Sequence, residues 1–75
     1  MNINVKDVLT LDDNNEYAVV SKINYENINY YYLVDRNNYG AKFLYEDNDE
    51  LVEVNDKDLV TKLLPLFYEV AKNIE

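Results

Sequence analysis

Cysteine and histidine are both absent from this 75-residue chain. Without cysteine the chain has no disulfide framework and no thiolate site. Without either residue, zinc and related metals lose the sulfur and nitrogen ligands that they usually take in proteins. We therefore expect neither a metal site nor a cofactor.

Long apolar runs are also missing. No stretch approaches the roughly 18 apolar residues of a membrane-spanning helix. The first ten residues have no basic start and no apolar run of the kind found in signal peptides. The expectation is a cytoplasmic protein.

The residue types that carry most enzyme chemistry are scarce. The sequence has no histidine base, no thiol, no glycine-rich phosphate loop and no Gly-x-Ser-x-Gly elbow. Carboxylate pairs are present, but a chain this short rarely encloses a cleft that could tune their pKa values. We therefore predict that the protein is not an enzyme.

Positive charge is in short supply. Seven basic residues stand against 15 acidic ones, which gives a formal net charge of −8. Such a charge repels nucleic acid and anionic membranes, so we expect no direct contact with either. It favours solubility, or a protein partner with a basic surface. The oligomeric state is left open.

Segments rich in β-branched and aromatic residues, separated by turns rich in Asn and Asp, fill the chain before residue 55. The asparagines suit turns because they tolerate a positive φ, and Gly40 is the residue most expected to adopt one. Residues 1–7 are expected to be a polar lead-in. The predicted strands are Val8–Leu11, Glu16–Tyr25, Ile28–Asp35, Ala41–Glu46 and Leu51–Val54. Alternation along the second strand places Tyr17, Val19, Ser21, Ile23 and Tyr25 on one face.

Residues 56–74 form the segment with a clear helical period, and Asn55 or Asp56 can cap its start. Pro65 inside it costs about 3 kcal/mol, but it lies on the polar face, where water can reach the carbonyl of Thr61 that it frees. The apolar stripe passes Pro65 without a phase change, which favours one kinked helix over two helices divided at Leu64. The predicted apolar residues, within an arc of roughly 160°, are Leu59, Val60, Leu63, Leu64, Leu66, Phe67, Val70, Ala71 and Ile74.

Consecutive strands joined by tight turns favour an antiparallel meander. We predict one α+β domain over residues 1–75, in which a four- to five-stranded antiparallel meander carries a kinked C-terminal helix packed on the sheet. Strong curvature would turn the meander into a partly open, SH3-like barrel. The sequence leaves this choice open.

Four segments carry a resemblance to a known family. They are the acidic turn before Glu16 and Tyr17, the Tyr25-Glu26-Asn27 hairpin leading to Tyr30-Tyr31-Tyr32-Leu33, the strand Leu51–Val54, and Leu63-Leu64-Pro65-Leu66-Phe67. Together they resemble a family of short, acidic, functionally uncharacterised bacterial proteins, a domain of unknown function, over residues 8–70. Members often have a glycine in the Tyr-Glu turn, where this chain has Asn27 and Ile28. The resemblance implies a β-meander with a helix and no activity.

Acidic residues are densest between residues 46 and 58. One interpretation is a solvated turn followed by a helix start, where carboxylates are expected. Another is a docking surface for a basic partner, and an alternative is a nucleic-acid mimic that inhibits a DNA- or RNA-binding enzyme of phage or mobile-element type. A calcium-binding EF-hand is rejected because Val52 stands where its glycine is required. The candidate partner-binding residues are Glu46, Asp47, Asp49, Glu50, Glu53, Asp56 and Asp58.

Two other groups of residues have a structural interpretation beside a functional one. Asp12, Asp13 and Glu16 fit a turn better than a site. The run Tyr30–Tyr32 suits strand packing, although an aromatic platform beside acidic loops would suit a basic, proline-rich peptide. The overall prediction is a small, acidic, non-enzymatic interaction module or regulator that binds a protein through an acidic and aromatic surface.

Overall fold

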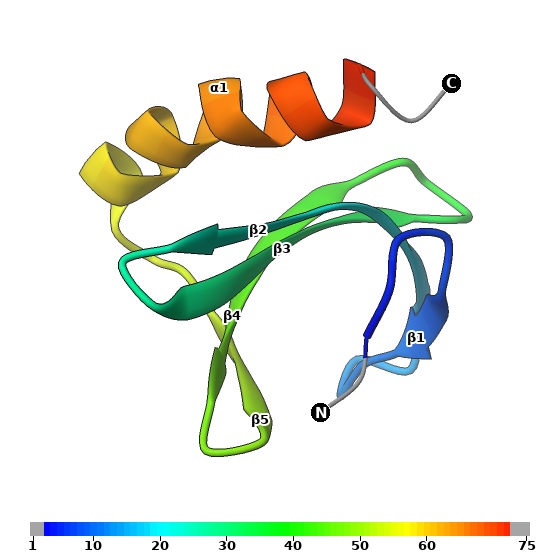
Figure 1. Cartoon of the computed structure of the whole chain (residues 1–75). Helices are drawn as coiled ribbons and strands as arrows, with labels where there is room; N and C mark the ends of the chain where they lie inside the picture. The colour runs from blue at the N-terminus through cyan, green and yellow to red at the C-terminus, as the bar shows by residue number, and fades with distance from the viewer. Residues whose placement is uncertain (1–2, 73–75) are drawn as a thin grey trace.

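The computed structural model describes residues 3–72, with side chains described through Glu69. Five antiparallel strands form one sheet in the order β1-β2-β3-β4-β5, and one helix follows them. The sheet curls into a half-barrel, and α1 lies across its outer face (Figure 1). The predicted α+β fold is therefore confirmed, and of the two sheet forms that the sequence left open the structure has the partly open barrel. The elements are β1 (Val8–Thr10), β2 (Glu16–Tyr25), β3 (Ile28–Asp35), β4 (Ala41–Asp47), β5 (Glu50–Glu53) and α1 (Lys57–Lys72).

The predicted limits agree with these elements for β2 and β3, and they differ by no more than one residue for β1, β4 and β5. The helix starts one residue after the predicted position, and predicted residues 73 and 74 lie outside the described residues. The helix continues through Pro65, which is exposed, so the alternative of two helices divided at Leu64 is wrong. Asp56 caps the helix by accepting hydrogen bonds from the backbone N–H groups of Asp58 (3.0 Å) and Leu59 (3.3 Å).

Two hairpin turns have a positive φ at both central residues. The values are 51° and 66° at Glu26 and Asn27, and 50° and 66° at Asn48 and Asp49. This is the type I′ pattern, whose twist matches that of the flanking strands. Asparagine supplies one of the two residues in each turn, as the sequence predicted.

The prediction that Gly40 adopts a positive φ is wrong, because Tyr39 does so instead, at 61°. The Asp35 carboxylate accepts hydrogen bonds from the backbone N–H of Asn37 and of Asn38 (2.7 and 3.3 Å). The N–H of Tyr39 then donates to the Asp35 carbonyl (3.0 Å), which closes a helix-like turn at Tyr39. Its side chain is 80% exposed, so the left-handed backbone brings the ring against no packed neighbour.

A β-bulge divides β2 into two halves. Val19 lies opposite Leu33, but Ser21 lies opposite Tyr32, the neighbouring residue of β3, so Val20 is the extra residue. The two halves of the strand therefore direct their odd-numbered side chains to opposite faces of the sheet. The predicted common face is wrong: Tyr17 and Val19 lie on the inner face, and Ser21, Ile23 and Tyr25 lie on the helix side.

Both faces of the curled sheet are packed. The inner cluster fills the concave face, and the helix-side cluster lies between the convex face and α1. The inner cluster consists of buried Ile3, Tyr17, Val19, Tyr31, Leu33 and Leu44 with half-buried Leu9, Leu11 and Leu51. The helix-side cluster consists of buried Ile23, Tyr30, Leu63 and Phe67 with Tyr25, Tyr32, Phe43, Tyr45, Val54 and Leu59.

Ile3 corrects the prediction of a wholly polar lead-in, since its side chain is only 6% exposed. In the described part of the chain no second sheet covers the concave face, and the segment before β1 supplies apolar surface there. Lys22 helps to hold this segment, because its Nζ donates to the Ile3 carbonyl at 3.0 Å.

The buried stripe of α1 is narrower than predicted. Leu63 and Phe67 are buried, whereas Leu64 and Leu66 remain 43% and 40% exposed. A helix on a convex surface touches it along a narrow strip, so residues at the margins of a wide apolar arc stay in water. The predicted positions Val70, Ala71 and Ile74 lie outside the residues whose side chains are described. Ser21 adds a polar link, because its buried hydroxyl donates to the Phe67 carbonyl (3.1 Å).

Candidate functional site

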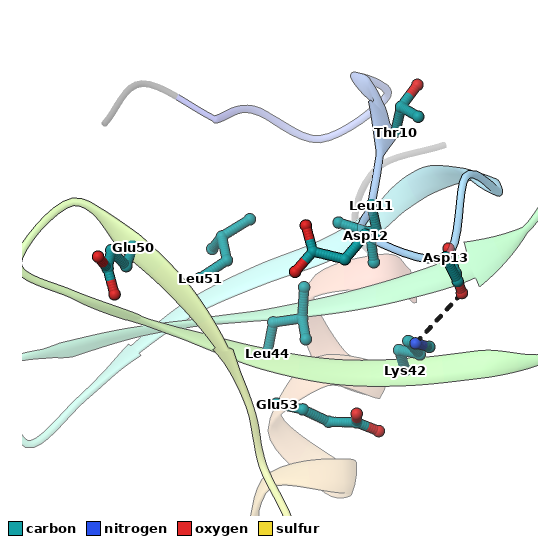
Figure 2. A pocket seen from close by; sticks show the side chains of 9 residues that line it. All are labelled: Thr10, Leu11, Asp12, Asp13, Lys42, Leu44, Glu50, Leu51 and Glu53. Carbon is teal, nitrogen blue, oxygen red and sulfur yellow. Dashed lines mark ion pairs between the residues drawn. The ribbon is translucent and has the colours of Figure 1, made fainter.

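A groove of about 890 Å³ lies on the inner side of the half-barrel, between the β1–β2 turn and the β4–β5 hairpin (Figure 2). We call it the edge groove. Its base is apolar and its rim is charged, a combination that suits binding of an amphipathic segment. The lining residues are Thr10, Leu11, Asp12, Asp13, Lys42, Leu44, Glu50, Leu51 and Glu53.

The apolar base belongs to the inner cluster. Leu44 is 5% exposed, and Leu11 and Leu51 are half-buried beside it. These three side chains come from the end of β1, from β4 and from β5, so the curl of the sheet is what brings them together (Figure 2). Packing of the core therefore also positions the base of the groove.

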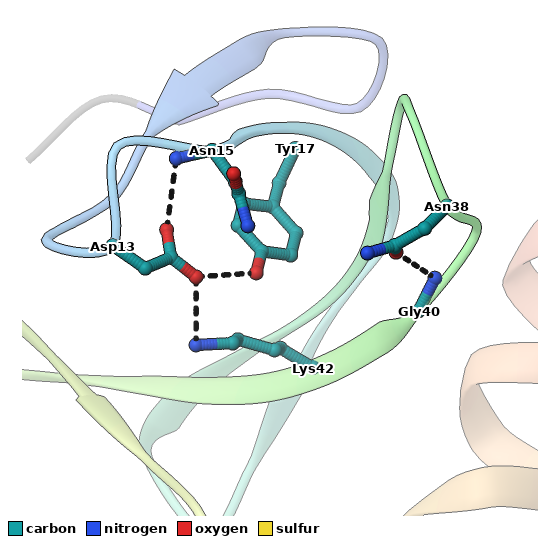
Figure 3. A network of polar contacts seen from close by, with 6 residues as sticks. All are labelled: Asp13, Asn15, Tyr17, Asn38, Gly40 and Lys42. Carbon is teal, nitrogen blue, oxygen red and sulfur yellow. Dashed lines mark hydrogen bonds and ion pairs between the residues drawn. The ribbon is translucent and has the colours of Figure 1, made fainter.

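Asp13 is held firmly in the turn between β1 and β2 (Figure 3). The Tyr17 hydroxyl donates to its Oδ2 at 2.7 Å, and the backbone N–H of Asn15 donates to its Oδ1 at 3.0 Å. Lys42 Nζ lies 3.4 Å from the same Oδ2 and 5.4 Å from the centre of the Tyr17 ring. The Asp13 carboxylate and the Lys42 ammonium therefore form an ion pair, and the carboxylate also stabilises the turn through its bonds to Asn15 and Tyr17.

These contacts shift three pKa values. The hydrogen bond from Tyr17, followed by that from Asn15, lowers the pKa of Asp13 against an opposing effect of burial. The same hydrogen bond, with burial, raises the pKa of the Tyr17 phenol. Burial acts to lower the pKa of Lys42, but the hydrogen bond to Asp13 and nearby negative charges outweigh it and raise the pKa. All three pKa values are shifted further from 7. Acid–base catalysis near pH 7 requires pKa values shifted toward 7.

The other carboxylates of the groove are open to solvent. Asp12, Glu50 and Glu53 are all exposed, and Figure 2 shows the Asp12 carboxylate directed toward Leu44 and Leu51. Four carboxylates and one lysine leave an excess of three negative charges along the lining. The groove is thus suited to a cationic ligand with apolar side chains.

The acidic run predicted from the sequence divides among four places in the structure. Glu50 and Glu53 line the groove, and Asp47 and Asp49 occupy the exposed end of the β4–β5 hairpin. Glu46 is half-buried on β4, where its Oε1 accepts a hydrogen bond from the Tyr31 hydroxyl at 2.9 Å. The remaining two, Asp56 and Asp58, lie at the start of α1, beyond the opposite end of β5 (Figure 1).

Sequence reasoning missed Asp12, Asp13 and Lys42 as parts of this site. Asp12 and Asp13 have the composition of a turn, and they do form one, so nothing marked them as part of a site. Lys42 is a single lysine within a strand and gave no signal either. The missing signal is the curl of the sheet, which places residues 12 and 53 along the same groove. No local pattern in the sequence encodes that arrangement.

The consecutive tyrosines of β3 do not form an exposed aromatic platform. Tyr30 and Tyr31 are buried on opposite faces of the sheet. Tyr32 is half-buried and stacks on Phe43 with ring centres 5.0 Å apart. The exposed tyrosines are instead Tyr39 and Tyr68, at 80% and 72%.

A second, largely apolar hollow of about 580 Å³ lies beside α1. Leu64, Pro65 and Tyr68 line it together with Tyr32 of the sheet. It lies on the helix side of the molecule, whereas the edge groove opens on the inner side.

Within residues 3–72, no group of three or more Asp or Glu side chains has an arrangement that could hold a metal ion. In the same part of the chain, no helix combines the length and apolar character needed to cross a bilayer. Comparisons with family models, with curated proteins and with solved structures found no match to this chain.

Proposed function

We propose that this protein is a small, non-enzymatic interaction module that binds a basic segment of another protein in the edge groove. The observation that carries the proposal is that the edge groove, at the open side of the half-barrel, has an apolar base and an acidic rim. Apolar contacts would provide affinity, and the carboxylates would select and steer a cationic partner. The expected setting is the cytoplasm, and the expected origin is bacterial.

A nucleic-acid mimic is the weaker alternative. Mimicry requires carboxylates on one surface at spacings close to those of phosphates. Here Asp47 lies near the hairpin end, Glu53 lies in the groove and Asp58 lies at the helix start. This distribution supports a local groove for a peptide more than an extended array.

Selection of short random peptides displayed on phage against the immobilised protein tests the proposal. We expect the enriched peptides to be rich in lysine and arginine, with apolar residues between them. Their affinity should fall as salt concentration rises, since screening weakens the attraction of exposed charges. Enrichment no greater than on a bare surface would contradict the proposal.

A matched pair of triple variants locates the binding. The groove variant carries Asp12→Asn, Glu50→Gln and Glu53→Gln, and the control carries Asp47→Asn, Asp58→Asn and Glu69→Gln. Each variant removes three charges, and Asp13 is kept in both because Tyr17 and Asn15 depend on it. We expect the groove variant to lose about ten-fold or more in affinity for the selected peptides, and the control to change by less than about three-fold. Equal losses in the two variants would place the binding elsewhere.

A further inference from the structure

Among residues 3–72, no strand pairs with the outer edge of β5. This strand is hydrogen-bonded to β4 and is the last strand in the sheet order. The N–H of Val54 donates to the Phe43 carbonyl at 2.8 Å, which fixes the phase of this ladder. Because hydrogen-bonded and non-hydrogen-bonded pairs alternate in antiparallel sheets, Glu50 and Val52 direct their backbone groups toward β4. Leu51 and Glu53 direct theirs outward.

The same two residues line the edge groove with their side chains. Leu51 belongs to the apolar base, and Glu53 belongs to the acidic rim. A peptide lying along β5 would therefore meet outward backbone donors and acceptors, an apolar contact and a carboxylate within one short strand. This combination is the one used when a peptide adds to a sheet edge: the main chain supplies affinity and alternate side chains supply specificity.

A second copy of this chain is a poor occupant of that edge. Pairing β5 with β5 would bring Glu50 and Glu53 of both copies together, and like charges across a strand pair are destabilising. The net charge of −8 adds repulsion between the copies. A cationic strand would be attracted both by Glu50 and Glu53 and by the net negative charge of the protein. Charge complementarity therefore selects a basic partner.

We infer that the partner segment binds as an added β-strand paired with the outer edge of β5. Its inward side chains would alternate between an apolar residue over Leu11 and Leu51 and a lysine or arginine near Asp12 and Glu53. This inference rests on the proposed function and specifies how the basic segment is held.

A backbone N-methyl scan of the tightest-binding selected peptide tests the pairing. Each synthetic copy carries one N-methyl group, which removes one N–H and leaves the side chains unchanged. We expect losses of about ten-fold or more at alternate positions, and changes of less than about three-fold at the positions between them. A loss pattern without this period of two would overturn strand pairing, even if the groove variant still abolishes binding.

Amide hydrogen exchange on the protein gives an independent measurement. The unmethylated peptide should slow exchange at Leu51 and Glu53 more than at Glu50 and Val52, which already donate to β4. Equal slowing at all four amides would argue against pairing along this edge. If no selected peptide discriminates the groove variant from its control, the proposed function itself fails, and the two failures are thereby distinguished.

Discussion

At the scale of single residues, Tyr31 explains why one carboxylate of the acidic run is half-buried. Its ring is completely buried in the inner cluster, and its hydroxyl reaches Glu46 Oε1 at 2.9 Å. Burial, followed by the hydrogen bond to Glu46, raises the pKa of this phenol to about 12. Glu46 therefore completes the core rather than adding to a charged surface.

The variant Tyr31→Phe should lower the free energy of unfolding by about 1–2 kcal/mol near neutral pH, because it removes a hydrogen bond to a charged group. The pH dependence should also change. The folded-state pKa is raised from 10.0 to about 12, so the stability linked to the neutral phenol is present below pH 10 and is lost as pH rises toward 12. Tyr31→Phe should lack this part of the alkaline decline.

Urea denaturation at several pH values above neutrality measures the effect as the difference between the two proteins, since their other tyrosines are shared. Tyr39→Phe is a suitable control, because Tyr39 is 80% exposed and should leave stability nearly unchanged. Parallel curves for the wild type and Tyr31→Phe between pH 10 and 12 would show that Tyr31 does not carry the shift.

At the scale of elements, the helix offers a direct comparison between a core leucine and a leucine of the same predicted stripe that remains exposed. Leu63→Ala should cost about 2–5 kcal/mol, because Leu63 is fully buried in the helix-side cluster. Leu66→Ala should cost less than about 1 kcal/mol, because Leu66 is 40% exposed.

Chemical denaturation of both variants, with circular dichroism as the probe, provides the measurement. A loss of this size is a large share of the stability of a small domain, so Leu63→Ala should be partly unfolded in buffer. Similar losses for the two variants would mean that the helix packs through the whole predicted arc.

The sequence predicted the elements well because alternation and turn residues are local signals. The limits of β2 and β3 follow from continuous strand-forming segments bounded by acidic and Asn-rich turns. The bulge at Val20 was missed because a valine beside a serine looks the same in a regular strand and in a bulged one. The edge groove was missed in part because it depends on the curl of the sheet, which joins the β1–β2 turn to β5.

At the scale of the whole molecule, the net negative charge opposes contact between copies of the protein. At neutral pH the formal charge is −8, and the free edge of β5 carries Glu50 and Glu53. Charged side chains on an edge strand are a common protection against edge-to-edge pairing. We therefore expect the acidic residues of β5 to oppose pairing of two copies along this edge.

Lowering the pH toward the sequence isoelectric point of about 4.3 should therefore promote association. Light scattering and sedimentation velocity should show a monomer at neutral pH and larger species near the isoelectric point, with recovery when the pH is restored. An unchanged monomer at both pH values would mean that charge does not limit pairing. Far-ultraviolet circular dichroism at each pH separates association of folded protein from acid unfolding.

The bulge at Val20 has a further consequence for how the protein comes apart. It allows the two halves of β2 to serve the inner and the helix-side clusters, and β3 and β4 also contribute side chains to both. The strands β1 and β5 contribute only to the inner cluster, whereas the helix-side cluster takes its strand residues from β2, β3 and β4. Detaching the helix would expose Phe43 and Tyr45 on the outer face of β4, the strand whose inner face carries Leu44 in the groove. Because β2, β3 and β4 supply side chains to both clusters, we expect the two clusters to unfold together as one cooperative unit.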